Sequence, residues 1–132
     1  MAEFDGKVAL VAGTTGIGRA SILRLAKGGA KVLALGIDDA GNSELAAIAA
    51  RDKLTIVVRK TDVSVADEVE AAVKDAVKHF GGLDIIVNSA AIHPYGDAVT
   101  TTPETFARTM AVNVGSIFLT AHFGVPLMRL RS

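Results

Sequence analysis

Short runs of apolar residues alternate along the chain with longer segments in which apolar positions recur at helical spacing. The runs are continuous, which is typical of strands buried on both faces of a parallel sheet. They predict strands at residues 7–12, 31–35, 54–58 and 83–88. The segments between them predict helices at residues 19–27, 43–51 and 65–80, and a long helix from residue 102 towards residue 128. This alternation predicts an α/β fold, in which right-handed βαβ units build a parallel sheet with helices on both faces.

Sequence signals mark the ends of two of these helices. Residues 64–67 (Ser-Val-Ala-Asp) are expected to cap the start of the third predicted helix, and the glycines at 81–82 to end it. Residues 101–104 (Thr-Thr-Pro-Glu) form a capping box with proline in the first turn and open the long helix. We expect Pro126 to kink this helix or to loosen its last turn.

The composition narrows the class of protein. The 132 residues carry 14 Lys and Arg against 14 Asp and Glu, so net charge does not support a role on nucleic acid or on a membrane surface. Half of the residues are apolar and 21% are charged, which excludes intrinsic disorder and predicts one domain over residues 1–132. The chain has no cysteine, no export signal at its start, and no uninterrupted apolar run of about 18 residues. We therefore expect a soluble, cytoplasmic protein without a membrane span.

A glycine-rich turn follows the first predicted strand. It reads Gly13-Thr14-Thr15-Gly16-Ile17-Gly18 and leads directly into a predicted helix. Glycines let a backbone turn tightly and approach a ligand closely, and the helix N-terminus offers unpaired N–H groups and a positive dipole end to a pyrophosphate. Because the turn joins a buried strand to a helix, nucleotide binding is favoured over an ordinary glycine-rich turn.

Three further segments combine with this turn into a pattern. The four motifs are Ala9-Leu10-Val11-Ala12-Gly13-Thr14-Thr15-Gly16-Ile17-Gly18-Arg19-Ala20, Thr61-Asp62-Val63-Ser64, Val87-Asn88-Ser89-Ala90-Ala91 and Val112-Asn113-Val114-Gly115. In this order they resemble the motifs of the classical short-chain dehydrogenase/reductase family, and the resemblance covers essentially the whole chain. It implies a three-layer, Rossmann-like doubly wound parallel sheet, here of about four strands in the order 3-2-1-4. Because family members are nearly twice as long, this chain resembles their N-terminal, cofactor-binding half.

The resemblance also implies roles for single residues around a bound NAD or NADP. The turn from Gly13 through Thr14, Thr15, Gly16 and Ile17 to Gly18 would surround the pyrophosphate, Asp62 and Val63 would contact the adenine, and Asn88, Ser89 and Ala90 would lie under the cofactor. Asn113 would take a supporting catalytic role, organising a water-linked proton path to the family's catalytic lysine. Two alternatives remain: Asp62 begins the cap of the following helix, and Asn113 is a polar residue satisfied inside a helix interface.

The chain departs from the family pattern in three places. Only Thr14 and Thr15 separate the first two glycines of the turn, where the family has three residues. The family's Asn-Asn-Ala-Gly appears as residues 88–91, Asn-Ser-Ala-Ala. The family's reaction needs a serine and a Tyr-x-x-x-Lys pair, but the single tyrosine here, Tyr95, is followed four positions later by Val99. We therefore expect this chain alone not to be a competent dehydrogenase.

The choice between NAD and NADP is open at this stage. An acidic residue at the end of the second strand would hold the ribose hydroxyls of NAD, and a basic neighbour would favour NADP. That position is Gly36 here, and Asp38 follows two residues later. Asp38 is a candidate for a ribose hydroxyl, and a solvated aspartate at the start of a helix is the alternative.

Other site classes find weaker support. The three histidines, at positions 79, 93 and 122, show no metal-ligand spacing, so we expect no metal site. A hydrolase would need Ser89 or Ser116 to act with His93, without the usual Gly-x-Ser-x-Gly elbow.

Three functional hypotheses follow. The first is the NAD(P)-binding domain of a short-chain dehydrogenase/reductase, which transfers a hydride between a nicotinamide cofactor and an alcohol or carbonyl substrate. The second is a non-catalytic binding or assembly module on a degenerate Rossmann scaffold, and the third is the hydrolase. The apolar long helix, residues 102–130, predicts a homodimer or a larger homo-oligomer. We expect a small-molecule substrate if the protein is active, and no nucleic-acid or membrane partner.

Overall fold

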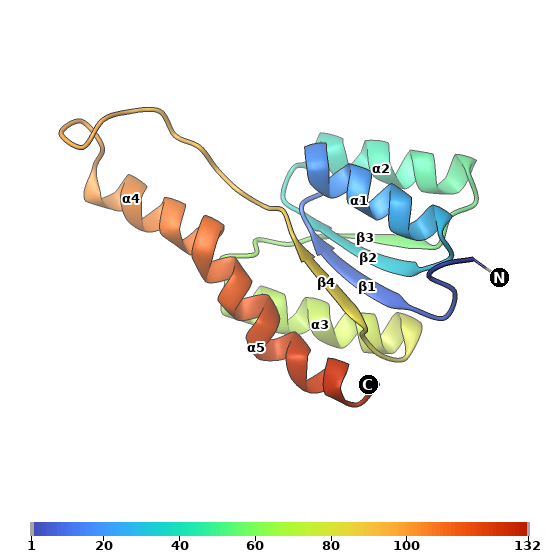
Figure 1. Ribbon diagram of the computed structural model, residues 1–132. Coiled ribbons are helices and arrows are strands. Elements are labelled where there is room, and N and C mark those ends of the chain that lie inside the picture. The colour runs from blue at the N-terminus through green and yellow to red at the C-terminus, as the bar shows by residue number, and fades with distance from the viewer. Residues whose placement is uncertain (1, 132) are drawn as a thin grey trace.

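The computed structural model describes residues 2–131 and has one parallel sheet at its centre (Figure 1). The strands are β1 (Val8–Ala12), β2 (Lys31–Gly36), β3 (Ile56–Lys60) and β4 (Ile85–Asn88). They are ordered β3-β2-β1-β4, and every pairing is parallel. The predicted fold class and strand order are therefore confirmed.

Helices cover both faces of this sheet. Figure 1 shows α1 (Gly16–Lys27) and α2 (Asp39–Arg51) on one face, and α3 (Ala66–Phe80) with α5 (Ser116–Arg129) on the other. The helix α4 (Pro103–Met110) extends away from the sheet and joins α5 through a π-helical turn, η1 (Ala111–Gly115).

The core divides into two layers because side chains alternate along each strand. Ala9 and Val11 of β1 point towards α1 and α2, while Leu10 and Ala12 point towards α3 and α5. All five residues of β1 are buried, as expected for a central strand between two helical layers. This burial holds the carboxyl ends of the strands at fixed positions.

Several predicted boundaries were wrong, among them the start of α1, which lies at Gly16 rather than at residue 19. Helix α2 begins at Asp39 rather than at residue 43, because the carboxylate of Asp38 caps it by accepting the backbone N–H of Gly41 at 2.8 Å. Strand β3 lies two residues later than predicted, where pairing with β2 places Ile56 opposite Val32. Strand β4 begins at Ile85 rather than at residue 83, because its pairing with β1 starts there.

Ser64 does not cap α3 as its position in the sequence suggests. The N-cap residue is Val65, which makes no side-chain capping bond, and the Ser64 hydroxyl bonds to Asp62 instead. The expected stop at the other end is confirmed, because Gly81 ends α3 in the left-handed conformation at φ +86°.

The long C-terminal helix differs from the prediction in its middle. Thr102 caps α4 by accepting the backbone N–H of Thr105 at 3.1 Å, with Pro103 in the first turn. The break in α-helical geometry occurs at η1, whereas α5 continues past Pro126 to Arg129. No local sequence signal announced this π turn, a feature that is frequent at functional sites.

The stretch from Pro103 to Arg129 is long and apolar enough to cross a bilayer, judged by length and composition alone. The absence of an uninterrupted apolar run in the sequence predicted no segment able to span a membrane, so this finding differs from that prediction. A helix packed on a protein core passes the same test, and α5 packs Leu119 and Phe123 against the core layer that contains α3.

Candidate functional site

A cavity of about 180 Å³ lies where the carboxyl ends of the four strands meet the first turns of the neighbouring helices. Its lining comes from the β1–α1 turn, the β2–α2 turn, the β3–α3 loop, the segment after β4, and two residues of α4 and η1. The lining residues are Gly13, Thr14, Thr15, Leu35, Gly36, Ile37, Asp38, Thr61, Asp62, Val63, Ser89, Ala90, Ala91, Ile92, Arg108 and Val112. In open α/β sheets, ligands bind at this edge.

The glycine turn is tight despite its missing residue. Gly13 has φ +115°, a conformation that only glycine adopts readily, and a Cβ there would lie 3.1 Å from the backbone nitrogen of Ala90. A Cβ on Gly18 would collide with the carbonyl oxygen of Gly13. The turn therefore brings the start of α1 against the end of β1, with no room for side chains at these two positions.

The N-terminus of α1 is free to receive an anion. Its N-cap, Thr15, makes no side-chain capping bond, and the first turn contains no acidic residue. The N–H groups at the start of the helix are thus unpaired by a cap, and the positive end of the helix dipole is not neutralised by a carboxylate.

Side-chain hydrogen bonds tie the shortened turn to α2. The buried hydroxyl of Thr14 donates to Asn42 Oδ1 at 2.6 Å, and Asn42 Nδ2 donates to the carbonyl of Gly36 at 2.9 Å. Arg19 donates through Nε to the Thr14 carbonyl at 3.0 Å and through Nη2 to the Gly41 carbonyl at 2.7 Å. These bonds fix the turn beside the end of β2, where the side chains of Thr14 and Asn42 fill the space next to Gly36.

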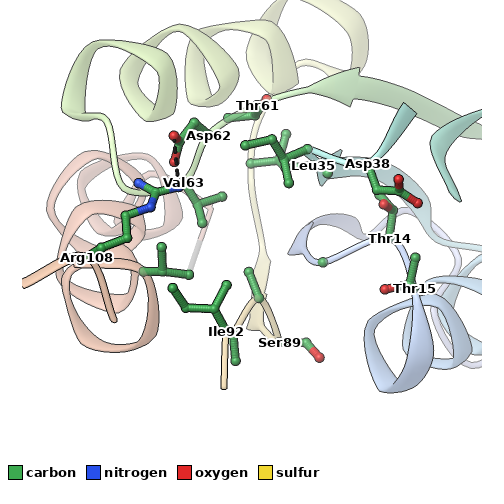
Figure 2. A pocket seen from close by; sticks show the side chains of 16 residues that line it. Thr14, Thr15, Leu35, Asp38, Thr61, Asp62, Val63, Ser89, Ile92 and Arg108 are labelled. Atoms are coloured by element: carbon green, nitrogen blue, oxygen red, sulfur yellow. Dashed lines mark hydrogen bonds and ion pairs between the residues drawn. The ribbon is translucent and has the colours of Figure 1, made fainter. Parts of the chain in front are cut away.

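Asp62 and Val63 lie at the opposite end of the cavity from Asp38, as Figure 2 shows. Val63 is buried and packs in the core layer of α3. Partial burial of Asp62 acts to raise its pKa, but hydrogen bonds from Ser64 and the charge of Arg108 outweigh it and hold the pKa below its usual value. Asp62 is therefore an ionised acceptor at neutral pH.

The segment after β4 places its residues on different sides. Ser89 continues the sheet by donating its N–H to the Ala12 carbonyl at 2.8 Å, and both Ser89 and Ala90 line the cavity. Asn88 does not line it, because its Oδ1 accepts the hydroxyl of Thr120 on α5 at 2.9 Å.

Asn113 lies in η1 and bonds to the backbone of Ile92 in both directions. Its Nδ2 donates to the Ile92 carbonyl at 2.9 Å, and its Oδ1 accepts the Ile92 N–H at 2.8 Å. It lines a second cavity of about 410 Å³, beside His93 and Tyr95. The side chain is thus hydrogen-bonded to a loop rather than inside a helix interface, and its role in a proton path stays a prediction.

The structure therefore brings together only part of the predicted site. Eight predicted residues line the first cavity: Gly13, Thr14, Thr15, Asp38, Asp62, Val63, Ser89 and Ala90. Gly16, Ile17 and Gly18 form the start of α1 beside it, and Ile17 is 80% exposed. Arg108 and Ile92 were missed: Ile92 directly follows the third motif, and nothing in the local sequence of Arg108 indicates that α4 reaches this edge of the sheet.

The described residues, 2–131, also bear on a metal site, which the sequence did not predict, and on the hydrolase alternative. No group of three or more His, Cys, Asp or Glu is placed to hold a metal ion within that range. The second cavity has His93 in its lining but no serine from the described part of the chain, and the hydroxyl of Ser116 donates to the Val112 carbonyl at 2.5 Å.

Comparison with known proteins agrees with this geometry. The family profile described as Enoyl-(Acyl carrier protein) reductase matches residues 11–132. A solved short-chain dehydrogenase/reductase from Serratia marcescens is similar, with 33% identity and a TM-score of 0.88 over 95% of this chain and 52% of that one. This chain belongs to the short-chain dehydrogenase/reductase family.

Two further proteins are similar to this chain over nearly its whole length. An uncharacterized oxidoreductase from Thermotoga maritima is 38% identical over 96% of this chain and 50% of the relative. The 3-ketoacyl-(acyl-carrier-protein) reductase from Brucella melitensis, solved in complex with NADH, is 34% identical with a TM-score of 0.88, over 98% of this chain and 53% of that one. The chain thus spans about half the length of the family members it matches.

Proposed function

We propose that this chain is the NAD(P)-binding half of a short-chain dehydrogenase/reductase and that the cavity at the strand ends holds the adenosine end of the cofactor. The observation that carries the proposal is the uncapped start of α1 directly beside that cavity. Gly13 and Gly18 leave a backbone cradle at the point where a pyrophosphate would approach the helix dipole. Val63 and Asp62 offer an apolar wall and an ionised acceptor to an adenine ring and its amino group.

In this function the chain binds the cofactor. Hydride transfer would take place only in a protein that contains this chain and also supplies a serine and a Tyr-x-x-x-Lys pair. The nicotinamide of the bound cofactor would give or accept the hydride. The substrate would be a small alcohol or carbonyl compound. We expect the 132-residue chain alone to bind cofactor without turning over such substrates.

A fluorescence titration with NADH tests the proposal. We expect nicotinamide emission to rise along a saturable curve in the micromolar to millimolar range. Absence of binding up to millimolar NADH would contradict the proposal and favour a non-catalytic binding or assembly module. Ser43→Ala, in the exposed middle of α2, is a suitable control because Ser43 does not line the cavity.

We also propose that the site prefers NAD to NADP. Asp38 lines the cavity next to Thr14 and Thr15, where the adenosine ribose would lie, and its charge would repel a 2′-phosphate (Figure 2). The nearby Arg19 is occupied by two backbone carbonyls and by Glu44. Among the cavity-lining residues that the structure describes, no free cation is therefore in place beside Asp38 to receive the phosphate.

Asp38→Ser tests this preference without removing the helix cap, since serine is as good an N-cap as aspartate. We expect the substitution to tighten NADPH binding about tenfold and to leave the unfolding midpoint nearly unchanged. Tighter binding of NADPH than of NADH by the unsubstituted chain would contradict the proposal.

For assembly, we propose a homodimer through α4, η1 and α5. Their exposed apolar side chains recur at helical spacing: Phe106, Met110, Val114, Ile117 and Phe118. A patch of this kind marks an interaction surface. Light scattering should give twice the chain mass at micromolar concentration, and Phe118→Asp should give the monomer; a monomeric unsubstituted chain would overturn the proposal.

A further inference from the structure

Arg108 links α4 to the loop before α3 at one end of the cavity, although it belongs to none of the four sequence motifs. It lies in the last turn of α4 and lines the cavity. Its Nη1 donates to Ser64 Oγ at 2.5 Å, and its Nη2 donates to Asp62 Oδ2 at 3.3 Å. Figure 2 shows the guanidinium facing the carboxylate across this end of the cavity.

The Ser64 hydroxyl sets the direction of these bonds. Ser64 Oγ lies 2.6 Å from Asp62 Oδ1, and an ionised carboxylate can only accept, so the hydroxyl donates its single proton to Asp62. Its lone pairs then accept the N–H of Arg108. The guanidinium is therefore connected to Oδ2 directly and to Oδ1 through the hydroxyl, which fixes the orientation of the Asp62 side chain.

This arrangement leaves one carboxylate oxygen partly available. Oδ1 accepts both the hydroxyl and the backbone N–H of Ser64, the latter at 3.0 Å, and so uses its two lone-pair sites. Oδ2 accepts the long bond from Arg108 and retains a second lone pair. That remaining acceptor suits the exocyclic amino group of an adenine.

Helix α4 continues through η1 into α5, which packs on the core, and its own contacts with the rest of the protein include polar bonds of this kind. None of its residues is buried, and only Thr105 and Thr109 are even half-buried. Arg108 connects it to the β3–α3 loop, and one turn further Asn113 connects η1 to Ile92. Arg108 and Asn113 are therefore two separate polar links between this stretch and the loops beside it.

We propose that Arg108 is a positioning residue for the cofactor: through Ser64 and Asp62 it orients the adenine acceptor, and it couples occupancy of the adenine end to the position of α4. This inference rests on the proposed function. It adds a residue and a coupling that the cofactor motifs do not contain.

The charges around Asp62 provide a readout that a purely structural role would not change. Arg108 faces the carboxylate from α4, and Glu68 of α3 accepts the backbone N–H of Asp62 at 3.0 Å. The positive charge of Arg108 helps to lower the pKa of Asp62, so removing it raises that pKa. Asp62 then becomes protonated, and loses an acceptor, at a higher pH.

The test compares Arg108→Gln, Arg108→Lys and the control Arg51→Gln, which removes a surface arginine paired with its neighbour Asp52. NADH binding is measured by fluorescence, and AMP and reduced nicotinamide mononucleotide are measured by competition. We expect Arg108→Gln to weaken the binding of NADH and of AMP equally, by about fivefold, and to leave the binding of the mononucleotide unchanged. As the pH is lowered, this variant should also lose its affinity for NADH at a higher pH than the unsubstituted chain does. Arg108→Lys should restore the pH dependence and part of the affinity, because lysine keeps the charge without the fork.

Ser64→Ala supplies a second, independent arm. If the guanidinium acts through the hydroxyl, the effects of Ser64→Ala and Arg108→Gln on the AMP dissociation constant should be less than additive. Unchanged affinity for AMP and NADH in Arg108→Gln at both neutral and acidic pH would overturn the positioning role alone. Failure of the unsubstituted chain to bind NADH would overturn the proposed function and this inference together.

Discussion

The two walls of the cavity are held in different ways. One wall consists of turns that follow β1, β2 and β3, and β1 is buried along its whole length. The other includes Arg108 of α4, a helix without a buried residue. The first wall is positioned by apolar burial, and the second by hydrogen bonds and an ion pair. Since burial of a large side chain contributes more than a typical hydrogen bond, substitutions should affect the two walls by different amounts.

The largest expected effect is on the buried wall. Leu33 of β2 is fully buried between the sheet neighbours and α3, so Leu33→Ala should lower the free energy of unfolding by about 3 kcal/mol. Leu130→Ala is the matched control, because Leu130 is 82% exposed and its loss should change stability by less than about 0.5 kcal/mol. Urea unfolding of both variants measures the difference. Equal effects would mean that the sheet does not form the stable part of the molecule.

A smaller effect is expected where the first wall meets the cofactor. Gly18→Ala would push its Cβ into the Gly13 carbonyl and should weaken NADH binding at least about tenfold. Gly115→Ala is the control, since a Cβ there would lie at an ordinary 3.7 Å from the Met110 carbonyl oxygen. If Gly18→Ala binds NADH normally, the β1–α1 turn is not the phosphate cradle.

Next to the second wall, in η1, we expect effects of hydrogen-bond size. Asn113→Ala removes both bonds to Ile92 and should lower the free energy of unfolding by about 1–2 kcal/mol. It should also speed hydrogen exchange at the Ile92 amide. Asn113→Asp keeps the acceptor for that amide and should protect it better than alanine does. Equal exchange rates in the two variants would show that the amide is protected by something other than this side chain.

The smallest effect concerns the end of α5. The hydrogen bond from Arg131 is the main cause that holds the pKa of Asp84 below its usual value, with a further bond from the Val8 N–H, while burial opposes them. A lowered carboxylate pKa stabilises the fold above the ordinary pKa, and this stabilisation is lost as the pH falls through the folded value.

Arg131→Gln should therefore lower stability slightly at neutral pH and move acid unfolding to a slightly higher pH. Circular dichroism along an acid titration measures the shift. Arg24→Gln, which breaks an exposed pair with Glu3, is the control and should not move the acid transition as far. An acid transition at the same pH in both variants would mean that Asp84 does not contribute to acid unfolding.

The amino-acid sequence by itself determined the layers of the molecule and one side of the site. Continuous apolar runs such as that of β1 indicate a strand buried on both faces, and the glycines of the turn indicate places where two backbone segments come close together. Both patterns can be read from neighbouring residues in the sequence, although a contact such as that of Gly13 with Ala90 joins distant segments. The helical layers and the glycine-rich turn could therefore be predicted from the order of residues alone. The strand order and the roles of the site residues followed from the resemblance of the motifs to a known family.

Only the tertiary structure decided which distant side chains complete the site. Arg108 meets Asp62 and Ser64 from a helix far along the chain, and Asn88 turns away from the cavity to bond with Thr120 of α5. The same arginine reaches Ser64, whose hydroxyl bonds to Asp62 two residues before it instead of capping α3. Such polar contacts produce no periodic pattern along the chain, because they depend on where the sheet and helices place two distant residues. The preference of each segment for helix or strand is satisfied whether or not these contacts form.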